Sequence, residues 1–287
     1  MNDSALLSCE WVEQNINTKN TVILDATFFL PRQNRNAQKE YQQQHLPGAL
    51  FFDIDKVADL SNSLSHMLPS IEDFADTVAK MGIANDTQVL IYDNNHFFAA
   101  ARVWWMFRVF GHDLVHIVDG GLVRWKQLNF PVNSEQPVQI TKSFKARYHP
   151  ELVFNLEQMA CVQKNKSRQI IDARSTDSFL AQRKLADTSL QAGHIPGSSN
   201  IPYARLTCAE QQTLLTEQTL QALFEGAQLN LSQPIVTTCG SGVSAAVLAL
   251  ALYQLGLKEV PIYDGSWAEW GRQTDTVKSI GERQHAP

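Results

Sequence analysis

The sequence contains two similar copies of one pattern, and this internal repeat limits the possible folds more than any other feature. The paired segments are VILDAT (22–27) with IIDARS (170–175), HLPGALFFDI (45–54) with HIPGSSNIPY (194–203), and DGGLVRWK (119–126) with DGSWAEWG (264–271). The pairs occur in the same order, and Asp25 and Asp172 are 147 residues apart while Asp119 and Asp264 are 145 apart. Such a period is too long for a solenoid, so each copy is expected to form a domain.

Both copies alternate short apolar runs with amphipathic or apolar helical patterns. The expected strands are 22–24, 89–92 and 115–118 in the first copy, and 169–171, 235–238 and 260–263 in the second. The expected helices are 71–81, 99–110, 216–224 and 244–255. Strands that alternate with helices form parallel sheets through right-handed crossovers. The sequence therefore predicts an α/β protein of two tandem domains, each a parallel sheet with helices on both faces.

A polar segment that begins and ends in proline separates the copies. This segment, PVNSEQPVQITKSFKARYHP at 131–150, has the composition of a linker. The predicted division is a first domain over 1–132, a linker over 133–150 and a second domain over 151–287.

Composition excludes several classes of function. The chain of 287 residues is 44% hydrophobic and 18% charged, which is typical of a folded domain rather than a disordered segment. Its net charge of −5 and the lack of a basic run argue against a nucleic-acid or membrane partner. The four cysteines form no CxxC pair, so neither a metal site nor a cofactor is expected. No secretory signal or membrane-length apolar run is recognisable, so a cytoplasmic location is expected.

One cysteine lies in a sequence context typical of a reactive thiol. Cys239 follows the predicted strand 235–238 and precedes the predicted helix 244–255. Glycines after Cys239 allow the backbone to turn tightly and bring its N–H groups close to the sulfur. The positive end of the helix points at the same loop, and together these features favour the thiolate, which is the reactive form. The predicted active-site loop comprises Gly240, Ser241, Gly242, Val243 and Ser244.

Three reactions use a thiolate held in such a loop: cleavage of phosphate esters, redox chemistry and sulfur transfer. Cysteine phosphatases need an arginine six positions after the cysteine, where this chain has Ala245. No resolving cysteine is apparent, although Cys208 remains a candidate, and Cys9 and Cys161 have no activating context. Sulfur transfer needs one thiolate only, and loop N–H groups would stabilise the resulting persulfide.

The chain resembles the tandem-domain rhodaneses, and among them the 3-mercaptopyruvate sulfurtransferases more than the thiosulfate enzymes. The motifs that carry the resemblance are HLPGALFFDID, SHMLP (65–69), ARVWWMFRVFGH (101–112), DGGLVRW, DARS, GHIPG (193–197), CGSGVS and YDGSWAEW (263–270). The resemblance implies an inactive first domain and a catalytic second domain whose Cys239 carries a persulfide. The implied partners are a small sulfur donor, with 3-mercaptopyruvate favoured, and a thiol, cyanide or protein acceptor. A thiosulfate:cyanide sulfurtransferase, or a persulfide relay or sensor that docks a protein, are the alternatives.

The resemblance also assigns individual residues. Aligning Gly111 with Gly256 places Asn94 at the position of Cys239 in the first copy. His45 is a candidate to assist proton transfer with Ser241.

The substrate-binding residues depart from the family pattern. The family holds the substrate carboxylate with two arginines, and this chain has Ser178 and Asp187 at those positions. Arg183 and Lys184 in the same segment, and Arg102 in the first copy, are the alternative candidates for substrate binding.

Overall fold

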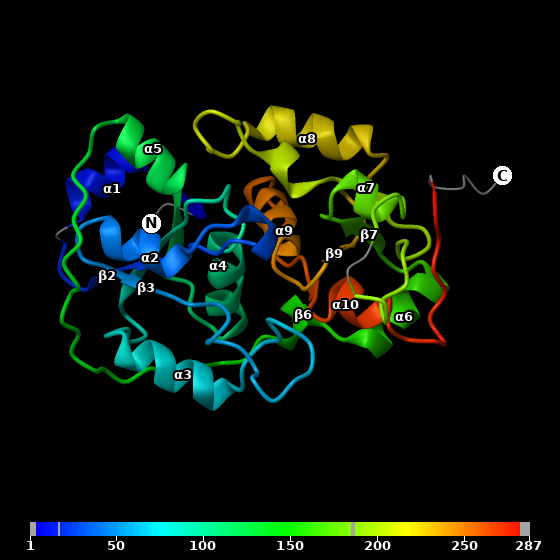
Figure 1. The fold of residues 1–287 in the computed structure, drawn as a ribbon, viewed down its shortest axis with the longest axis horizontal. Helices are drawn as coiled ribbons and strands as arrows, with labels where there is room; N and C mark the ends of the chain where they lie inside the picture. The colour runs from blue at the N-terminus through cyan, green and yellow to red at the C-terminus, as the bar shows by residue number, and fades with distance from the viewer. Residues whose placement is uncertain (1–3, 17, 185–186, 282–287) are drawn as a thin grey trace. The chain divides into compact units, whose positions relative to one another are not determined.

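The computed structural model describes residues 4–16, 18–184 and 187–281 and contains two compact units (Figure 1). The first unit comprises Met1–Ser61, Leu68–His149 and Thr207–Leu214. The second comprises Asn62–Met67, Pro150–Leu206 and Leu215–Pro287. Each unit thus includes a short segment from the other half of the sequence, at 207–214 and at 62–67, which the sequence pattern did not predict.

Each unit contains one parallel sheet of five strands, and the two sheets have the same strand order. The first sheet is ordered β1 (Leu6–Ser8), β5 (Val115–Asp119), β4 (Gln88–Tyr92), β2 (Thr21–Asp25) and β3 (Ala49–Phe51). The second is ordered β6 (Val153–Phe154), β10 (Ile262–Tyr263), β9 (Ile235–Thr238), β7 (Gln169–Asp172) and β8 (Ser199–Asn200). The second order is the first with every strand number raised by five, which agrees with a duplicated domain.

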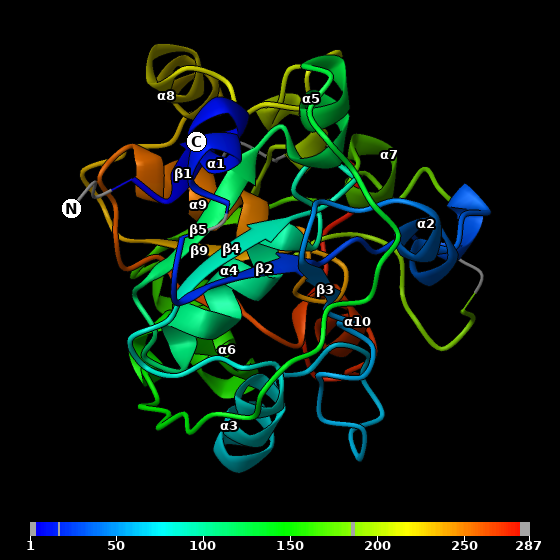
Figure 2. The ribbon, with the colours of Figure 1, turned by 90° about the vertical axis from the view of Figure 1, so that its left-hand side faces the viewer.

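Helices cover both faces of the first sheet, as predicted (Figure 2). One face packs on α1 (Cys9–Asn15) and α5 (Gly121–Gln127) through a core that contains Val12, Leu90 and Trp125. On the other side, Phe74 of α3 (Ile71–Lys80) contacts Phe107 of α4 (Ala100–Val109) at a ring-centroid distance of 5.2 Å. A further helix, α2 (Ala37–Gln43), precedes β3. Alternate residues of β4 are buried on opposite faces, which is the reason its apolar run is continuous.

The second sheet is covered in the same way. Met159 of α6 (Leu156–Asn165) and Trp267 of α10 (Ser266–Trp270) share a core with Val236 of β9. The remaining helices are α7 (Thr176–Phe179), α8 (Glu217–Gly226) and α9 (Ala245–Gln254). Residues 245–252 of α9 are all buried, as expected for a helix that is apolar on every side. No helix in the described part of the chain is long and apolar enough to cross a membrane.

The predicted linker is largely docked on the first unit. The backbone N–H groups of Lys142, Arg147 and His149 donate to carbonyls of that unit, at 2.9, 2.9 and 2.8 Å. The Phe144 side chain is buried, and its ring lies 6.1 Å from that of Phe74. The first unit therefore extends to residue 149, beyond the predicted boundary at 132.

Asp25 is a buried carboxyl of the first unit that lacks the cationic partner of its counterpart. Asp172, its equivalent, pairs with Arg174 at 2.6 Å, whereas the residue two positions after Asp25 is Thr27. Burial raises the pKa of Asp25 to about 6, although the Thr27 backbone N–H donates to its Oδ1 at 2.9 Å. A pKa raised by folding stabilises the protein below the unfolded pKa, and this stabilisation is lost as the pH rises through about 6.

Asp25→Asn is therefore expected to gain stability relative to the wild type as the pH rises. The expected gain in relative free energy of unfolding between about pH 4 and pH 8 is about 2 kcal/mol, because asparagine does not ionise. Urea unfolding of both proteins at several pH values measures this difference. Asp86→Asn, at an exposed position, is the matched control. A pH-independent difference for Asp25→Asn would contradict the assignment.

Candidate active site

Cys239 lies at the carboxyl end of β9, directly before the loop that leads into α9. Ligands of parallel sheets bind at this end of the strands, where loops meet helix N-termini. The Cys239 side chain is buried, whereas the next two residues of the loop, Gly240 and Ser241, are only half-buried. The partly accessible portion of this site is therefore the start of the loop rather than the side chain of Cys239 itself.

Hydrogen bonds to the segment 263–268 fix the backbone of Cys239. Its N–H donates to the Ser266 hydroxyl at 3.1 Å, and its carbonyl accepts from the Trp267 N–H at 3.0 Å. The Gly240 carbonyl accepts from the Ala268 N–H at 2.8 Å. Ser266 has a φ of 49°, a left-handed conformation that is costly for serine, and its hydroxyl bonds to Cys239 help to hold it there. The start of α10 thus positions Cys239.

The loop that follows Cys239 contains several backbone donors without a partner in the described chain. Gly242 has a φ of 74°, which glycine adopts without strain. Among the described residues, the N–H groups of Gly240, Ser241, Val243 and Ser244 have no protein acceptor. The Ser244 side chain does not cap α9, so the positive end of this buried helix remains open toward the loop. Unpaired backbone N–H groups beside a helix N-terminus are the usual elements of an anion-binding loop.

The loop hydroxyl of Ser241 pairs with a histidine that the sequence pattern did not single out. His66 Nδ1 lies 3.2 Å from Ser241 Oγ, and both residues belong to the second unit. His66 is half-buried and has a φ of 65°. It lies within the SHMLP motif, so the motif was recognisable, but its chemical role was not.

His45, the predicted partner of Ser241, has a structural role instead. Its ring is fully buried and stacks on Tyr41 at a centroid distance of 4.2 Å. Its Nδ1 and Nε2 lie 2.6 and 3.0 Å from the carbonyl oxygens of Tyr41 and Glu135. Because both ring nitrogens bind backbone carbonyls, the structure does not support the prediction that His45 assists Ser241.

The candidate substrate-binding residues have different environments. Arg102 is 1% exposed, and its guanidinium lies 4.5 Å from the centre of the Trp105 ring, inside the first unit. Arg183 and Lys184 are exposed and lie next to residues outside the described part of the chain. The structure thus gives neither of these two a contact with the loop of Cys239, and their role in substrate binding stays a prediction.

The two positions at which the family has arginines take part in local contacts. Ser178 Oγ lies 3.0 Å from Ser175 Oγ. Asp187 forms an ion pair with Arg272 at 2.5 Å. A guanidinium therefore lies beside position 187, but it belongs to Arg272. These contacts agree with the absence of the arginine pair.

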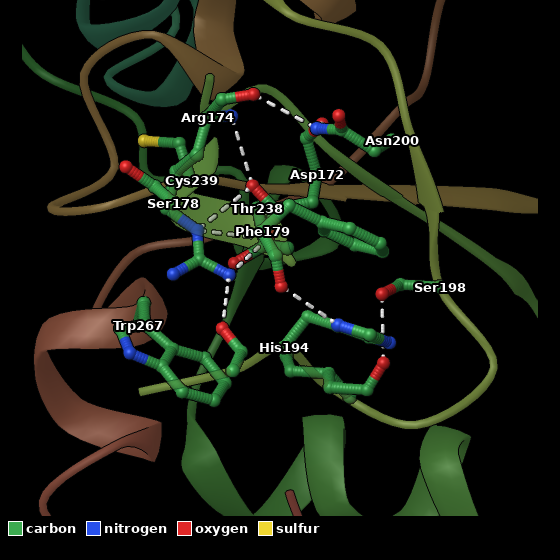
Figure 3. A network of polar contacts seen from close by, with 12 residues as sticks. Asp172, Arg174, Ser178, Phe179, His194, Ser198, Asn200, Thr238, Cys239 and Trp267 are labelled. Atoms are coloured by element: carbon green, nitrogen blue, oxygen red, sulfur yellow. Dashed lines mark hydrogen bonds and ion pairs between the residues drawn. The ribbon is translucent and has the colours of Figure 1, made fainter. Parts of the chain in front are cut away.

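Arg174 is held by a buried network in the same unit (Figure 3). Its Nε and Nη2 donate to the carboxylate of Asp172, with distances of 2.6–3.1 Å. Nη2 also donates to the Gly193 carbonyl at 2.8 Å. The next residue, His194, stacks on Phe179 at 3.8 Å. Arg174 therefore ties the end of β7 to the segment that precedes β8.

In the first unit an aspartate stands at the position of Cys239. Asp25 pairs with Tyr92 and Asp172 with Thr238, so the residues that follow, Asp93 and Cys239, are equivalent. The carbonyl of Asp93 accepts from Leu122, as that of Cys239 does from Trp267. Asp93, rather than the predicted Asn94, therefore stands at the cysteine position. The prediction was wrong by one residue because the loop before α4 is one residue longer than the loop before α9.

The Asp93 carboxylate fills the loop of its own unit. It accepts hydrogen bonds from four backbone N–H groups, at 3.0–3.1 Å, which belong to Asn95, Phe97, Ala99 and Ala100. The side chain is buried, and this burial raises its pKa. The first unit thus has neither a thiol nor a free ring of donors at this place.

The other cysteines lack the environment of Cys239. The Cys9 thiol is buried and donates to the Asp119 carbonyl at 3.3 Å, and burial raises its pKa to about 12. Cys161 is exposed on α6, and Cys208 is half-buried. In the described residues, no group of three or more His, Cys, Asp or Glu side chains is arranged to hold a metal ion.

Comparison with known proteins agrees with this architecture. The family model of the rhodanese-like domain matches residues 8–128 and again 156–273. The human protein named 3-mercaptopyruvate sulfurtransferase is 38% identical over 98% of this chain and 97% of its own length. The rat thiosulfate sulfurtransferase is 39% identical over 97% of this chain and 95% of its own length. The chain therefore belongs to the rhodanese family.

A solved structure shows the same fold. The crystal structure of SseA from Escherichia coli, described with the 3-mercaptopyruvate sulfotransferases, has a TM-score of 0.84 and 36% identity. It covers 92% of this chain and 99% of its own. Two tandem rhodanese-like domains, as the sequence predicted, are thus confirmed.

Proposed function

We propose that the protein is a sulfurtransferase that carries sulfane sulfur on Cys239. The donor favoured is 3-mercaptopyruvate, as in the relatives that bear this name at 36–38% identity. The observation that carries the proposal is the buried thiol directly before the N-terminus of α9, in a loop where the N–H groups of Gly240, Ser241, Val243 and Ser244 have no acceptor in the described part of the chain. This loop suits an anionic persulfide, which needs donors rather than a second thiol.

The reaction has two steps. In the first, the Cys239 thiolate attacks the sulfur of 3-mercaptopyruvate and breaks its carbon–sulfur bond, and the electron pair leaves on the enolate of pyruvate, which takes up a proton. In the second, a thiol, cyanide or protein thiol attacks the outer sulfur, and the electron pair of the sulfur–sulfur bond returns to Cys239. The sulfur atom is thus transferred without a net change in the enzyme.

Ser241 and His66 are the proposed proton carriers of the first step. Their hydrogen bond of 3.2 Å joins the loop after Cys239 to an imidazole, a side chain that can both donate and accept a proton. A hydroxyl beside the donor sulfur, relayed to imidazole, can move the proton that the enolate requires.

The persulfide on Cys239 is directly testable. After incubation with 3-mercaptopyruvate without an acceptor, the Cys239 peptide is expected to gain about 32 Da, the mass of one sulfur, as in persulfidation. The exposed Cys161 serves as the internal control and should gain nothing. Absence of the adduct with both 3-mercaptopyruvate and thiosulfate would contradict the proposed function.

A persulfide relay that accepts sulfur from another protein is the second candidate. It is favoured by the replacement of both family arginines, since Ser178 and Asp187 offer no positive charge to a small anionic donor. Turnover with 3-mercaptopyruvate and thiosulfate near background, with rapid sulfur uptake from a protein persulfide, would favour the relay. A higher kcat/KM for 3-mercaptopyruvate than for thiosulfate favours the primary proposal.

A cytoplasmic location is also proposed. All four cysteines are free thiols, which suits a reducing compartment. Fractionation of the cells that produce the protein tests this assignment.

A further inference from the structure

The Arg174 guanidinium uses only part of its donor capacity. An arginine side chain has five N–H donors, and those of Nε and Nη2 are directed at Asp172 and the Gly193 carbonyl. Nη1 has no acceptor among the described residues. In the described chain, the side-chain nitrogens and oxygens that are both buried and without a hydrogen-bond partner are Asn133 Oδ1 and Thr237 Oγ1. Nη1 of Arg174 is not one of them, so this nitrogen is not fully buried.

The Arg174 guanidinium and Cys239 share a neighbour, Trp267. The guanidinium lies 4.5 Å from the centre of the Trp267 ring, and the Trp267 backbone N–H donates to the Cys239 carbonyl at 3.0 Å. In Figure 3 the third guanidinium nitrogen points away from Asp172, to the side of the view on which Cys239 and Ser178 also lie.

Several other cations of this unit have contacts elsewhere. Arg272 pairs with Asp187 at the surface, and Arg168 lies over Phe154 at 5.3 Å and donates to the Ile235 carbonyl at the start of β9. Arg174 differs from them because its side chain is only 11% exposed and its position is fixed on two sides. A guanidinium held in this way loses little conformational freedom when it binds a ligand.

We propose that Nη1 of Arg174 donates to the anionic group of the sulfur donor, a carboxylate or the sulfonate end of thiosulfate. The inference rests on the proposed function. It assigns to Arg174 the selection of the sulfur donors that the enzyme binds. Asp172 balances the charge of Arg174, so the donor meets a directed hydrogen-bond donor rather than a free positive charge. Binding of anionic donors is therefore weaker than with a pair of uncompensated arginines.

Arg174→Lys separates this role from the structural one. Lysine keeps the charge beside Asp172 but has no planar fork, so it cannot serve Asp172, Gly193 and a donor together. KM for 3-mercaptopyruvate and for thiosulfate is expected to rise about tenfold or more, the effect of one lost charge-assisted hydrogen bond. The KM for the uncharged amide of 3-mercaptopyruvate, and kcat with it, should stay unchanged. Arg168→Lys, at the opposite end of the strands, is the matched control.

The outcomes are distinct. An equal loss with charged and uncharged donors would show a purely structural role and overturn the proposal, as would unchanged KM values for both anionic donors. If melting curves show that Arg174→Lys is unfolded, the wild type decides: its KM for the amide of 3-mercaptopyruvate should exceed that for the acid about tenfold, and equal values overturn the proposal. Failure of the proposed function itself appears separately, as a wild type that forms no persulfide with any donor, charged or not.

Discussion

Cys239→Ser is expected to lower kcat/KM for every sulfur donor by about 10⁴-fold or more, as is typical when a nucleophile is removed. The serine hydroxyl fits the same loop, but it is not ionised near neutral pH and is a poor acceptor of sulfane sulfur. The protein should remain folded, because the backbone bonds of residue 239 to Ser266 and Trp267 do not involve the sulfur. Steady-state kinetics and the mass of the 239 peptide measure both consequences.

The control for this variant is a serine at another cysteine. Cys161→Ser and Cys208→Ser should retain wild-type turnover, since neither thiol lies in a loop at a helix N-terminus. A comparable loss in Cys208→Ser would mean that a second thiol takes part, and the single-thiolate mechanism would then be wrong.

His66→Gln is expected to lower kcat with 3-mercaptopyruvate by about 100-fold, within the range for loss of a general acid or base. Glutamine keeps the ability to hydrogen-bond Ser241 Oγ, which His66 does at 3.2 Å, but it does not take up and release a proton. Thiosulfate releases sulfite without needing a proton on carbon, so turnover with thiosulfate should fall much less. Kinetics with the two donors on one preparation measure the difference.

His45→Gln is the comparison that distinguishes the two histidines. Loss of the imidazole bonds to the carbonyls of Tyr41 and Glu135 is expected to cost about 1–3 kcal/mol of stability. Turnover at a temperature where the variant is folded should be unchanged. A large drop in kcat for His45→Gln, together with a small one for His66→Gln, would restore the original assignment of His45.

The sequence predicted the features that depend on local pattern. The duplication, the central strands, the helices α3, α4, α8 and α9, and the location of Cys239 between β9 and α9 all follow from apolar runs and glycine positions, whereas α6 was not among the predicted helices. The edge strands β6 and β8 were not predicted because two residues are too short to give an alternating pattern. β10 begins at Ile262 rather than 260, because Pro261 has no N–H to donate to the sheet.

Features that depend on distant contacts were not predictable in this way. His66 and Ser241 are 175 positions apart, and no periodicity connects them. The replacement of the nucleophile by Asp93 required the strand register, because sequence alignment from Gly111 does not reveal where one extra residue lies. Likewise, the segment 133–149 is held mainly through its backbone, which polar composition does not indicate.

The carboxylate of Asp93 has a consequence for how a duplicated enzyme keeps one reactive centre. Its four hydrogen bonds from backbone N–H groups show that the loop of the first unit accommodates a negative charge that belongs to the chain itself. Asp93→Cys removes that carboxylate but leaves a loop one residue longer than the loop after Cys239. We therefore expect that this single substitution does not give the first unit a site like that of Cys239.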